Sequence, residues 1–135
     1  MNTNDTNTVG EKLIYKDLSY KITGACFDTH NEVGRFVRER QYGDTLENFL
    51  NEQGLVYTRE LRHSGGNNIL YFVIEDRVVL ELKAKKMILK SDFYQLQRYL
   101  QHTGKRLGLL VNFRNRYLKP IRIIRIDTDV RNKFT

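Results

Sequence analysis

The chain has 135 residues, of which 40% are hydrophobic and 29% charged, values typical of one globular domain with its own core. Its single cysteine, Cys26, excludes an internal disulfide, and no apolar stretch or N-terminal apolar segment is long enough for a membrane span or a signal peptide. With a net charge of +7, these features predict a cytoplasmic protein that does not contact a membrane and has an anionic partner.

Two amphipathic helices come first in the chain. We expect the polar residues 1–10 to form a disordered arm. Apolar residues at spacings of three and four then predict a helix over residues 16–32, which Gly34 ends, and a second over 38–53, which Gly54 ends.

The rest of the chain is dominated by strand formers. Three apolar or β-branched runs predict strands over 55–62, 69–74 and 78–84, joined by a turn at 63–68 and a three-residue loop at 75–77. A helix over 92–101, with Ser91 as its N-cap, separates them from an inner strand at 107–113 and an outer strand at 121–126, which follows Pro120. This order predicts the α/β class, a mixed central sheet flanked by helices, in one domain over 11–130 with a tail at 131–135.

The third predicted strand carries two opposite charges in an apolar run. Glu81 and Lys83 are two residues apart, so their side chains lie on the same face of the strand. Burying either charge alone is costly, so the pair must contact each other, bind a metal or line a cleft. The alternative is an edge strand whose polar face is in solvent. Taken alone, the tripeptide formed by residues 81–83 favours this alternative, because Lys and Glu are seldom buried.

Charge is also unevenly divided along the chain. Residues 1–82 hold 9 Lys/Arg and 13 Asp/Glu, whereas residues 83–135 hold 14 Lys/Arg and 3 Asp/Glu. A basic half that begins at Lys83 favours a phosphate backbone as partner over an ordinary solvated surface. The candidate phosphate contacts are Lys85, Lys86, Lys90, Arg98, Arg114 and Arg116.

Five stretches together resemble the small bacterial and archaeal family named for its GxxExxY motif, within the PD-(D/E)xK nuclease superfamily. They are residues 13–22, residues 30–34 with Glu39 and Tyr42, residues 79–84, residues 95–100 and residues 103–113. The resemblance covers roughly residues 12–126 and implies an αβββαβ restriction-endonuclease-like core. It also implies a hydrolase that cleaves DNA phosphodiesters with Mg²⁺ or Mn²⁺. Gln95-x-x-x-Tyr99 is similar to the helix motif of RecB-like nucleases in that superfamily.

The resemblance assigns roles to particular side chains. Glu81 and Glu39 would hold the metal ion, Lys83 would be the catalytic lysine, and Gln95 and Tyr99 would orient substrate or water. Each assignment has a structural alternative: Glu39 as a solvated helix charge, and Tyr99 as a core aromatic, like Tyr42. In the same way, His30 could cap or pack at a helix end, and Cys26 is expected in the core.

The chain departs from the family pattern at the expected second metal ligand. The family has an aspartate on the second strand, where this chain has Tyr71. A three-residue loop at 75–77 pairs Ile74 with Val78 and therefore Tyr71 with Glu81, on one face of the sheet. A neutral phenol is a weak ligand for Mg²⁺, which prefers carboxylate oxygens. In the GxxExxY motif itself, the second glycine is replaced by Phe36 among several arginines.

Two functions therefore remain open, ahead of a purely structural or interaction role. The first is a metal-dependent nuclease or its remnant, with Glu81, Glu39 and a backbone carbonyl around one ion. The second is a catalytically inactive nuclease fold that binds nucleic acid, or a protein partner, through its basic half. DNA is the expected nucleic acid, although RNA is not excluded, and the resemblance leaves a homodimer open.

Overall fold

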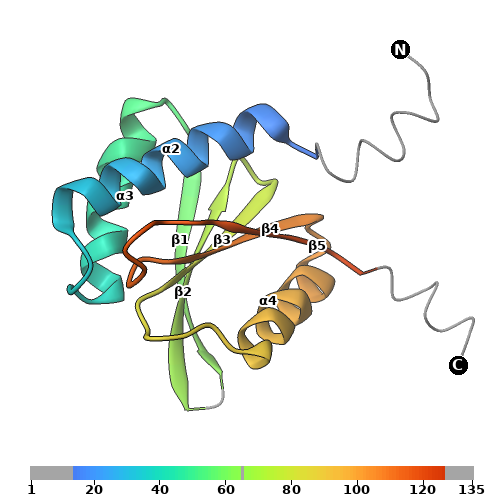
Figure 1. Cartoon of the computed structure of the whole chain (residues 1–135). Helices are drawn as coiled ribbons and strands as arrows, with labels where there is room; N and C mark the ends of the chain where they lie inside the picture. The colour runs from blue at the N-terminus through green and yellow to red at the C-terminus, as the bar shows by residue number, and fades with distance from the viewer. Residues whose placement is uncertain (1–13, 65, 127–135) are drawn as a thin grey trace, which may run out of the picture.

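The computed structural model describes residues 14–64 and 66–126, so the expected arm at 1–10 and the tail at 131–135 lie outside the described residues. The elements follow the predicted order of two helices, three strands, a helix and two strands (Figure 1). They are α2 (Lys16–Val33), α3 (Glu39–Glu52), β1 (Tyr57–Ser64), β2 (Asn67–Ile74), β3 (Val78–Lys83), α4 (Lys90–Thr103), β4 (Leu107–Asn112) and β5 (Ile121–Ile124).

The first two helices end where the sequence predicts. Gly34 and Gly54 both have positive φ, 80° and 69°, which glycine adopts without a steric penalty. Both helices bury their apolar stripe, including Cys26 of α2 and Tyr42 of α3. The expected core positions of these two residues are therefore confirmed.

The five strands form one mixed sheet in the order β1-β2-β3-β4-β5. β1, β2 and β3 are an antiparallel meander, β4 is parallel to β3 across the α4 crossover, and β5 is antiparallel to β4 at the edge. The predicted register is confirmed, because Ile74 pairs with Val78 and Tyr71 pairs with Glu81. β3 is thus a central strand and not the solvent-facing edge strand of the alternative interpretation.

The sheet is covered on both faces. α2 and α3 lie over one face and α4 over the other, as Figure 1 shows. Leu80 and Leu82 of β3 belong to the core on the α2–α3 face, whereas Val79 belongs to the core on the α4 face. Glu81 shares the parity of Val79 and therefore faces α4. Burial on both faces explains the nearly continuous apolar sequence of β3.

Several predicted boundaries were wrong: β1 runs over Tyr57–Ser64 and not 55–62, and α4 over Lys90–Thr103 and not 92–101. The β1–β2 turn is shorter than residues 63–68, because the ladder continues through the His63–Asn68 and Ser64–Asn67 pairs. Pairing with β1 overrides the low strand propensity of the asparagines. The N-cap of α4 is Leu89 and not Ser91, since the Asp92 carboxylate accepts the Leu89 amide at 2.7 Å. No helix in the described part of the chain is long and apolar enough to cross a membrane.

Candidate functional site

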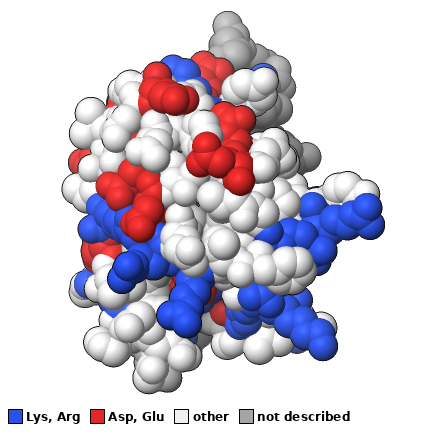
Figure 2. Space-filling view, turned by 90° about the vertical axis from the view of Figure 1, so that its left-hand side faces the viewer, with Lys and Arg blue, Asp and Glu red and all other residues white. Residues whose placement is uncertain are grey.

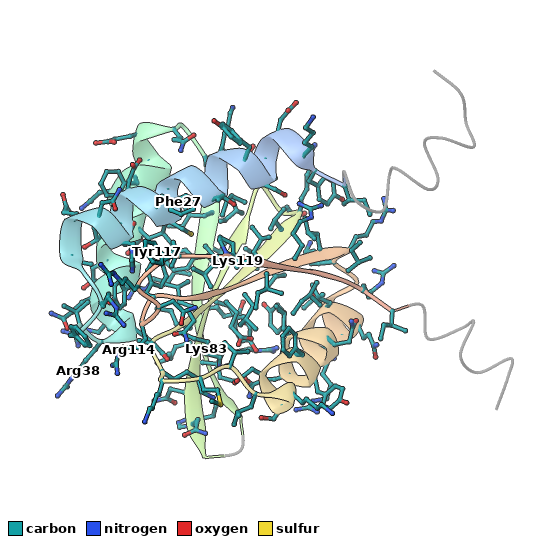
Figure 3. All side chains as sticks on the ribbon, viewed as in Figure 1. Phe27, Arg38, Lys83, Arg114, Tyr117 and Lys119 are labelled. Atoms are coloured by element: carbon teal, nitrogen blue, oxygen red, sulfur yellow. The ribbon has the colours of Figure 1, made fainter. Side chains whose placement is uncertain are left out.

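A pocket of about 530 Å³ lies where the carboxyl end of β3 meets the first turns of two helices. Its wall includes Lys83, the last residue of β3, Glu39, the first residue of α3, and Asp92 and Gln95 from α4. Figure 3 shows Lys83 at this end of the sheet, between the two helical layers. Crevices outside the carboxyl ends of strands are common ligand sites in α/β sheets, because helix N-termini converge there.

Lys83 is held by acceptors from its own strand and from α4. Its Nζ lies 3.2 Å from Glu81 Oε2 and 3.5 Å from Asp92 Oδ1, and it donates a hydrogen bond to Gln95 Oε1 at 3.2 Å. The side chain is 11% exposed, so these neighbours compensate for most of its lost hydration. Glu81 and Lys83, which the sequence places on one face of a strand, therefore lie together in a buried site.

Glu81 is completely buried and poorly satisfied. Neither of its carboxylate oxygens meets the full geometry of a hydrogen bond among the described residues, although Oε2 forms an ion pair with the Lys83 ammonium at 3.2 Å and the Tyr71 hydroxyl also acts to lower the pKa of Glu81. Burial raises the pKa of Glu81 to about 7, even though Lys83 acts to lower it. The carboxyl group thus changes its charge close to neutral pH.

Tyr71 fills the space directly opposite Glu81. Its ring stacks on Tyr99, with centroids 4.3 Å apart and an interplanar angle of 12°. Burial and the neighbouring Glu81 charge raise the pKa of Tyr71, so the phenol remains neutral at physiological pH. The Tyr99 hydroxyl donates to Glu60 Oε2 at 2.9 Å. Tyr99 therefore packs as a core aromatic, and its role toward a substrate remains a prediction.

Asp92 is a member of the site that sequence reasoning missed. Its two oxygens accept hydrogen bonds from Lys85 Nζ at 3.2 and 3.0 Å, and Lys83 lies on its other side. Burial acts to raise the pKa of Asp92, but the Leu89 amide and the Lys85 ammonium hold that pKa below its usual value. In the sequence, an acid in the first turn of a helix indicates only a cap.

Glu39 lies in the wall of the same pocket as Lys83. Its Oε1 accepts a hydrogen bond from the Ala84 amide at 3.3 Å, and burial raises its pKa against the opposing Lys83 charge. Glu39 is therefore tied to the end of β3, which is not the position of a fully solvated helix charge. Whether it holds a ligand remains a prediction.

The donor set does not fit the Mg²⁺ or Mn²⁺ that the resemblance implies. Within residues 14–64 and 66–126, no group of three His, Cys, Asp or Glu side chains is placed to hold an ion. The residue paired with Glu81 on β2 is Tyr71 and not a carboxylate, and the Lys83 ammonium lies beside Glu81. Mg²⁺ also keeps several waters, for which the fully buried Glu81 has no open side.

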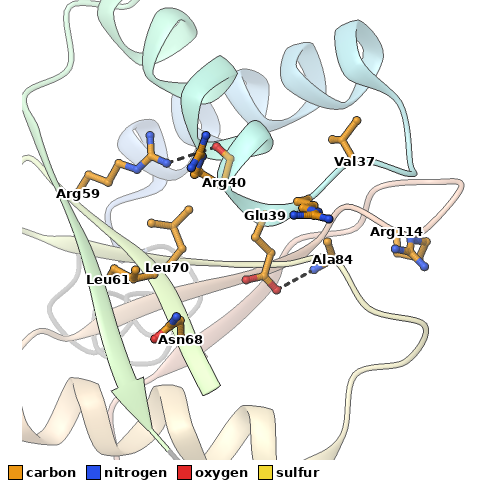
Figure 4. A pocket seen from close by; sticks show the side chains of 10 residues that line it. Val37, Glu39, Arg40, Arg59, Leu61, Asn68, Leu70, Ala84 and Arg114 are labelled. Atoms are coloured by element: carbon orange, nitrogen blue, oxygen red, sulfur yellow. Dashed lines mark hydrogen bonds between the residues drawn. The ribbon is translucent and has the colours of Figure 1, made fainter. Parts of the chain in front are cut away.

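The predicted phosphate contacts fall into two groups. Lys85 and Arg98 line the pocket that contains Lys83. Lys86 is exposed on the segment between β3 and α4, and Lys90 is the exposed first residue of α4. Arg114 instead lines a larger groove of about 760 Å³, bounded by the start of α3 and by β1 and β2 (Figure 4). Arg116 is exposed two residues further along the β4–β5 connection. On the face shown in Figure 2, basic side chains gather below the acidic ones.

His30 and Tyr42 belong to the packing around Phe113 and not to the pocket. The Tyr42 ring stacks on Phe113 at 4.4 Å, and its hydroxyl donates to Gly34 O at 2.6 Å. His30 Nε2 is 2.8 Å from Asn115 O, and its ring lies 6.3 Å from that of Phe113. The structural interpretation of both residues is confirmed.

Comparison with known proteins gives one result. The family model described as the PD-(D/E)XK nuclease superfamily matches residues 16–126. The open mixed sheet and its flanking helices agree with the restriction-endonuclease-like core of that superfamily. Neither a curated protein nor a solved structure matches the chain.

Proposed function

The chain belongs to the PD-(D/E)XK nuclease superfamily, and from this premise we propose that it binds nucleic acid at the Lys83 pocket without cleaving it. In this proposal the cationic side chains of Lys83, Lys85 and Arg98 face the phosphate backbone. The narrower assignment to the GxxExxY family and the preference for DNA are parts of the same proposal. They rest on the sequence motifs.

One observation carries the proposal: Tyr71 fills the position opposite Glu81 and Lys83 forms the ion pair that remains there. A nuclease of this type needs a hard cation to polarise the scissile phosphate. With a stacked, neutral phenol in that place, the pocket retains cationic groups but lacks a suitable ligand set. Binding therefore persists in our proposal while hydrolysis does not.

A metal-dependent nuclease is the second candidate, and it is favoured because the buried Glu81 carboxylate has an ion pair with Lys83 but no hydrogen bond among the described residues. Buried carboxylate oxygens without hydrogen bonds are costly, and a cation would satisfy them. The two candidates differ in a simple way. Only the nuclease gains thermal stability from Mn²⁺ and releases cleaved strands.

The first experiment measures binding of a fluorescently labelled 20-nucleotide DNA by anisotropy in EDTA, over a series of salt concentrations. We expect binding that weakens with salt, and Arg98→Ala should weaken it severalfold and reduce the log–log salt slope by about 1. Lys21→Ala is the matched control, because Lys21 is an exposed cation on α2 outside this pocket. Equal effects of the two variants, or no binding at all, would contradict the proposal.

The second experiment tests catalysis directly. Wild-type protein is incubated with plasmid and single-stranded DNA in Mg²⁺ or Mn²⁺, and its melting temperature is recorded with and without Mn²⁺. We expect intact DNA and an unchanged melting temperature. Metal-dependent cleavage that disappears in Glu81→Ala would instead establish the nuclease.

A further inference from the structure

Phe36 is a large apolar side chain that the protein leaves in solvent. It lies between α2 and α3 and is 75% exposed. Two guanidinium groups lie over its ring, with Arg35 Cζ 5.1 Å and Arg114 Cζ 5.5 Å from the centroid. These distances are within the range of cation–π contacts. Both guanidinium groups thus lie over the ring, and most of the side chain is still in solvent.

The two arginines are fixed by each other's backbone. Arg35 Nε donates to Arg114 O at 2.9 Å, and Arg114 Nε donates to Arg35 O at 3.0 Å. Side chains separated by 79 residues of sequence therefore form one clamp around Phe36. A clamp of this kind holds the ring in place before any partner arrives, which lowers the entropic cost of binding.

The arginines around the clamp lack acidic partners. Among the described residues, no ion pair involves Arg35, Arg38, Arg40, Arg114 or Arg116. Arg59 on the neighbouring strand contrasts with them, since it pairs with Asp44 and Glu47 at 2.7 and 2.6 Å. The charge of the clamp region is therefore available to an external anion.

An apolar groove adjoins the clamp and leads to the Lys83 pocket. Its lining includes the apolar side chains of Val37, Leu61 and Leu70 and the basic side chains of Arg38, Arg40 and Arg114. Figure 4 shows Arg40 and Arg114 on opposite sides of Glu39. Glu39 lines both this groove and the Lys83 pocket, so the two hollows are neighbours. An exposed aromatic ring beside a groove lined by cationic side chains is the pattern of surfaces that hold single-stranded nucleic acid.

We propose that the Phe36 clamp and the adjoining groove bind an unpaired, single-stranded segment of nucleic acid. One base stacks on the Phe36 ring, the arginines contact the flanking phosphates, and the strand continues toward Lys83. In a duplex the faces of the bases are stacked on one another, so they cannot contact the exposed ring or the aliphatic side chains of the groove. This inference rests on the proposed function and specifies the form of nucleic acid that the site accepts.

The test compares Phe36→Ala with Phe27→Ala, a second exposed phenylalanine, which lies on α2 away from the groove (Figure 3). Anisotropy is measured in EDTA with a labelled 20-nucleotide single strand and with the same sequence as a duplex. We expect Phe36→Ala to weaken single-strand binding by roughly 5- to 140-fold, the range for loss of one base–aromatic stack. Duplex affinity should change less than about twofold, Phe27→Ala should leave both unchanged, and Phe36→Trp should retain the affinity for the single strand.

Each other outcome overturns a particular claim. If Phe36→Ala behaves as Phe27→Ala does while Arg98→Ala still weakens binding, the single-strand inference fails and the proposed function stands. If the wild-type protein binds neither strand form, the proposed function fails as well. If poly-glutamate competes through Phe36 as effectively as the single strand does, the groove is a site for acidic peptides and the inference is wrong. Circular dichroism melting of each variant excludes loss of folding as the cause.

Discussion

At the level of single residues, the site is built around the Lys83 ammonium, which three acceptor side chains approach. Glu81, Asp92 and Gln95 all approach its ammonium, and two of them come from a helix that is separated from β3 in sequence. The Glu81–Lys83 contact was predictable, since alternation along a strand places both on one face. The part played by Asp92 was not predictable, because only the α4 crossover brings that carboxylate to the end of β3.

Glu81 should make the stability of the protein depend on pH. Its pKa is raised from 4.5 to about 7 in the folded state, so the folded protein binds the proton more tightly than the unfolded chain does. The resulting stabilisation is fully present below pH 4.5 and is lost as the pH rises through about 7. It amounts to about 3 kcal/mol at 1.36 kcal/mol per pH unit.

The measurement is urea unfolding of wild type and Glu81→Gln between pH 5 and 8. We expect the free energy of unfolding of the wild type to fall relative to that of Glu81→Gln as the pH rises. Glu52→Gln, an exposed residue at the end of α3, is the control and should run parallel to the wild type. Parallel profiles for all three proteins would show that burial does not perturb Glu81.

At the level of helices and strands, glycine positions and turn lengths allowed the helix ends and the strand register to be predicted. The ends of α2 and α3 followed from Gly34 and Gly54, and the β2–β3 register followed from a three-residue loop. The β1–β2 turn was predicted too long, because the composition of a polar segment does not reveal that its backbone continues a ladder. Local chemistry thus fixes helix ends more firmly than it fixes strand ends.

The approach of α4 to the sheet depends on one missing side chain. A Cβ on Gly108 of β4 would lie 2.9–3.1 Å from three atoms of the buried Leu96 on α4. Gly108→Ala should therefore force α4 outward and lower the free energy of unfolding by about 1–3 kcal/mol. Chemical denaturation measures this change.

Gly24→Ala is the matched control for that substitution. Gly24 lies within α2, and the nearest atom to an added Cβ is Gln53 Nε2 at 3.8 Å. This substitution should stabilise the protein by up to about 1 kcal/mol, since alanine favours a helix interior over glycine. If Gly108→Ala were equally harmless, the contact between Leu96 and β4 would not be tight.

At the scale of the whole molecule, one sheet is shared by two cores. The α2–α3 core and the α4 core use alternate residues of the same strands, so neither can unfold while the other keeps its strands in place. The sequence indicated one domain from length and continuous patterning, but not the division of its apolar residues between two faces. That division depends on strand pairing over long separations, such as β3 with β4.

We therefore expect unfolding in a single cooperative transition. Far-ultraviolet circular dichroism follows the helices, and tyrosine fluorescence follows the eight tyrosines without interference, because the chain contains no tryptophan. The two signals should give the same midpoint and the same slope in urea. Separate midpoints would mean that the layer containing α4 melts independently.

The stack of Tyr71 on Tyr99 has a consequence for anyone who wishes to engineer hydrolysis into this protein. Replacing Tyr71 by aspartate alone would leave an empty volume beneath Tyr99 and set a second acid against the already unsatisfied Glu81. A working design must refill that volume in the same step, by enlarging a neighbour of the lost ring. Installing a catalyst in this scaffold is therefore a problem of at least two coordinated substitutions.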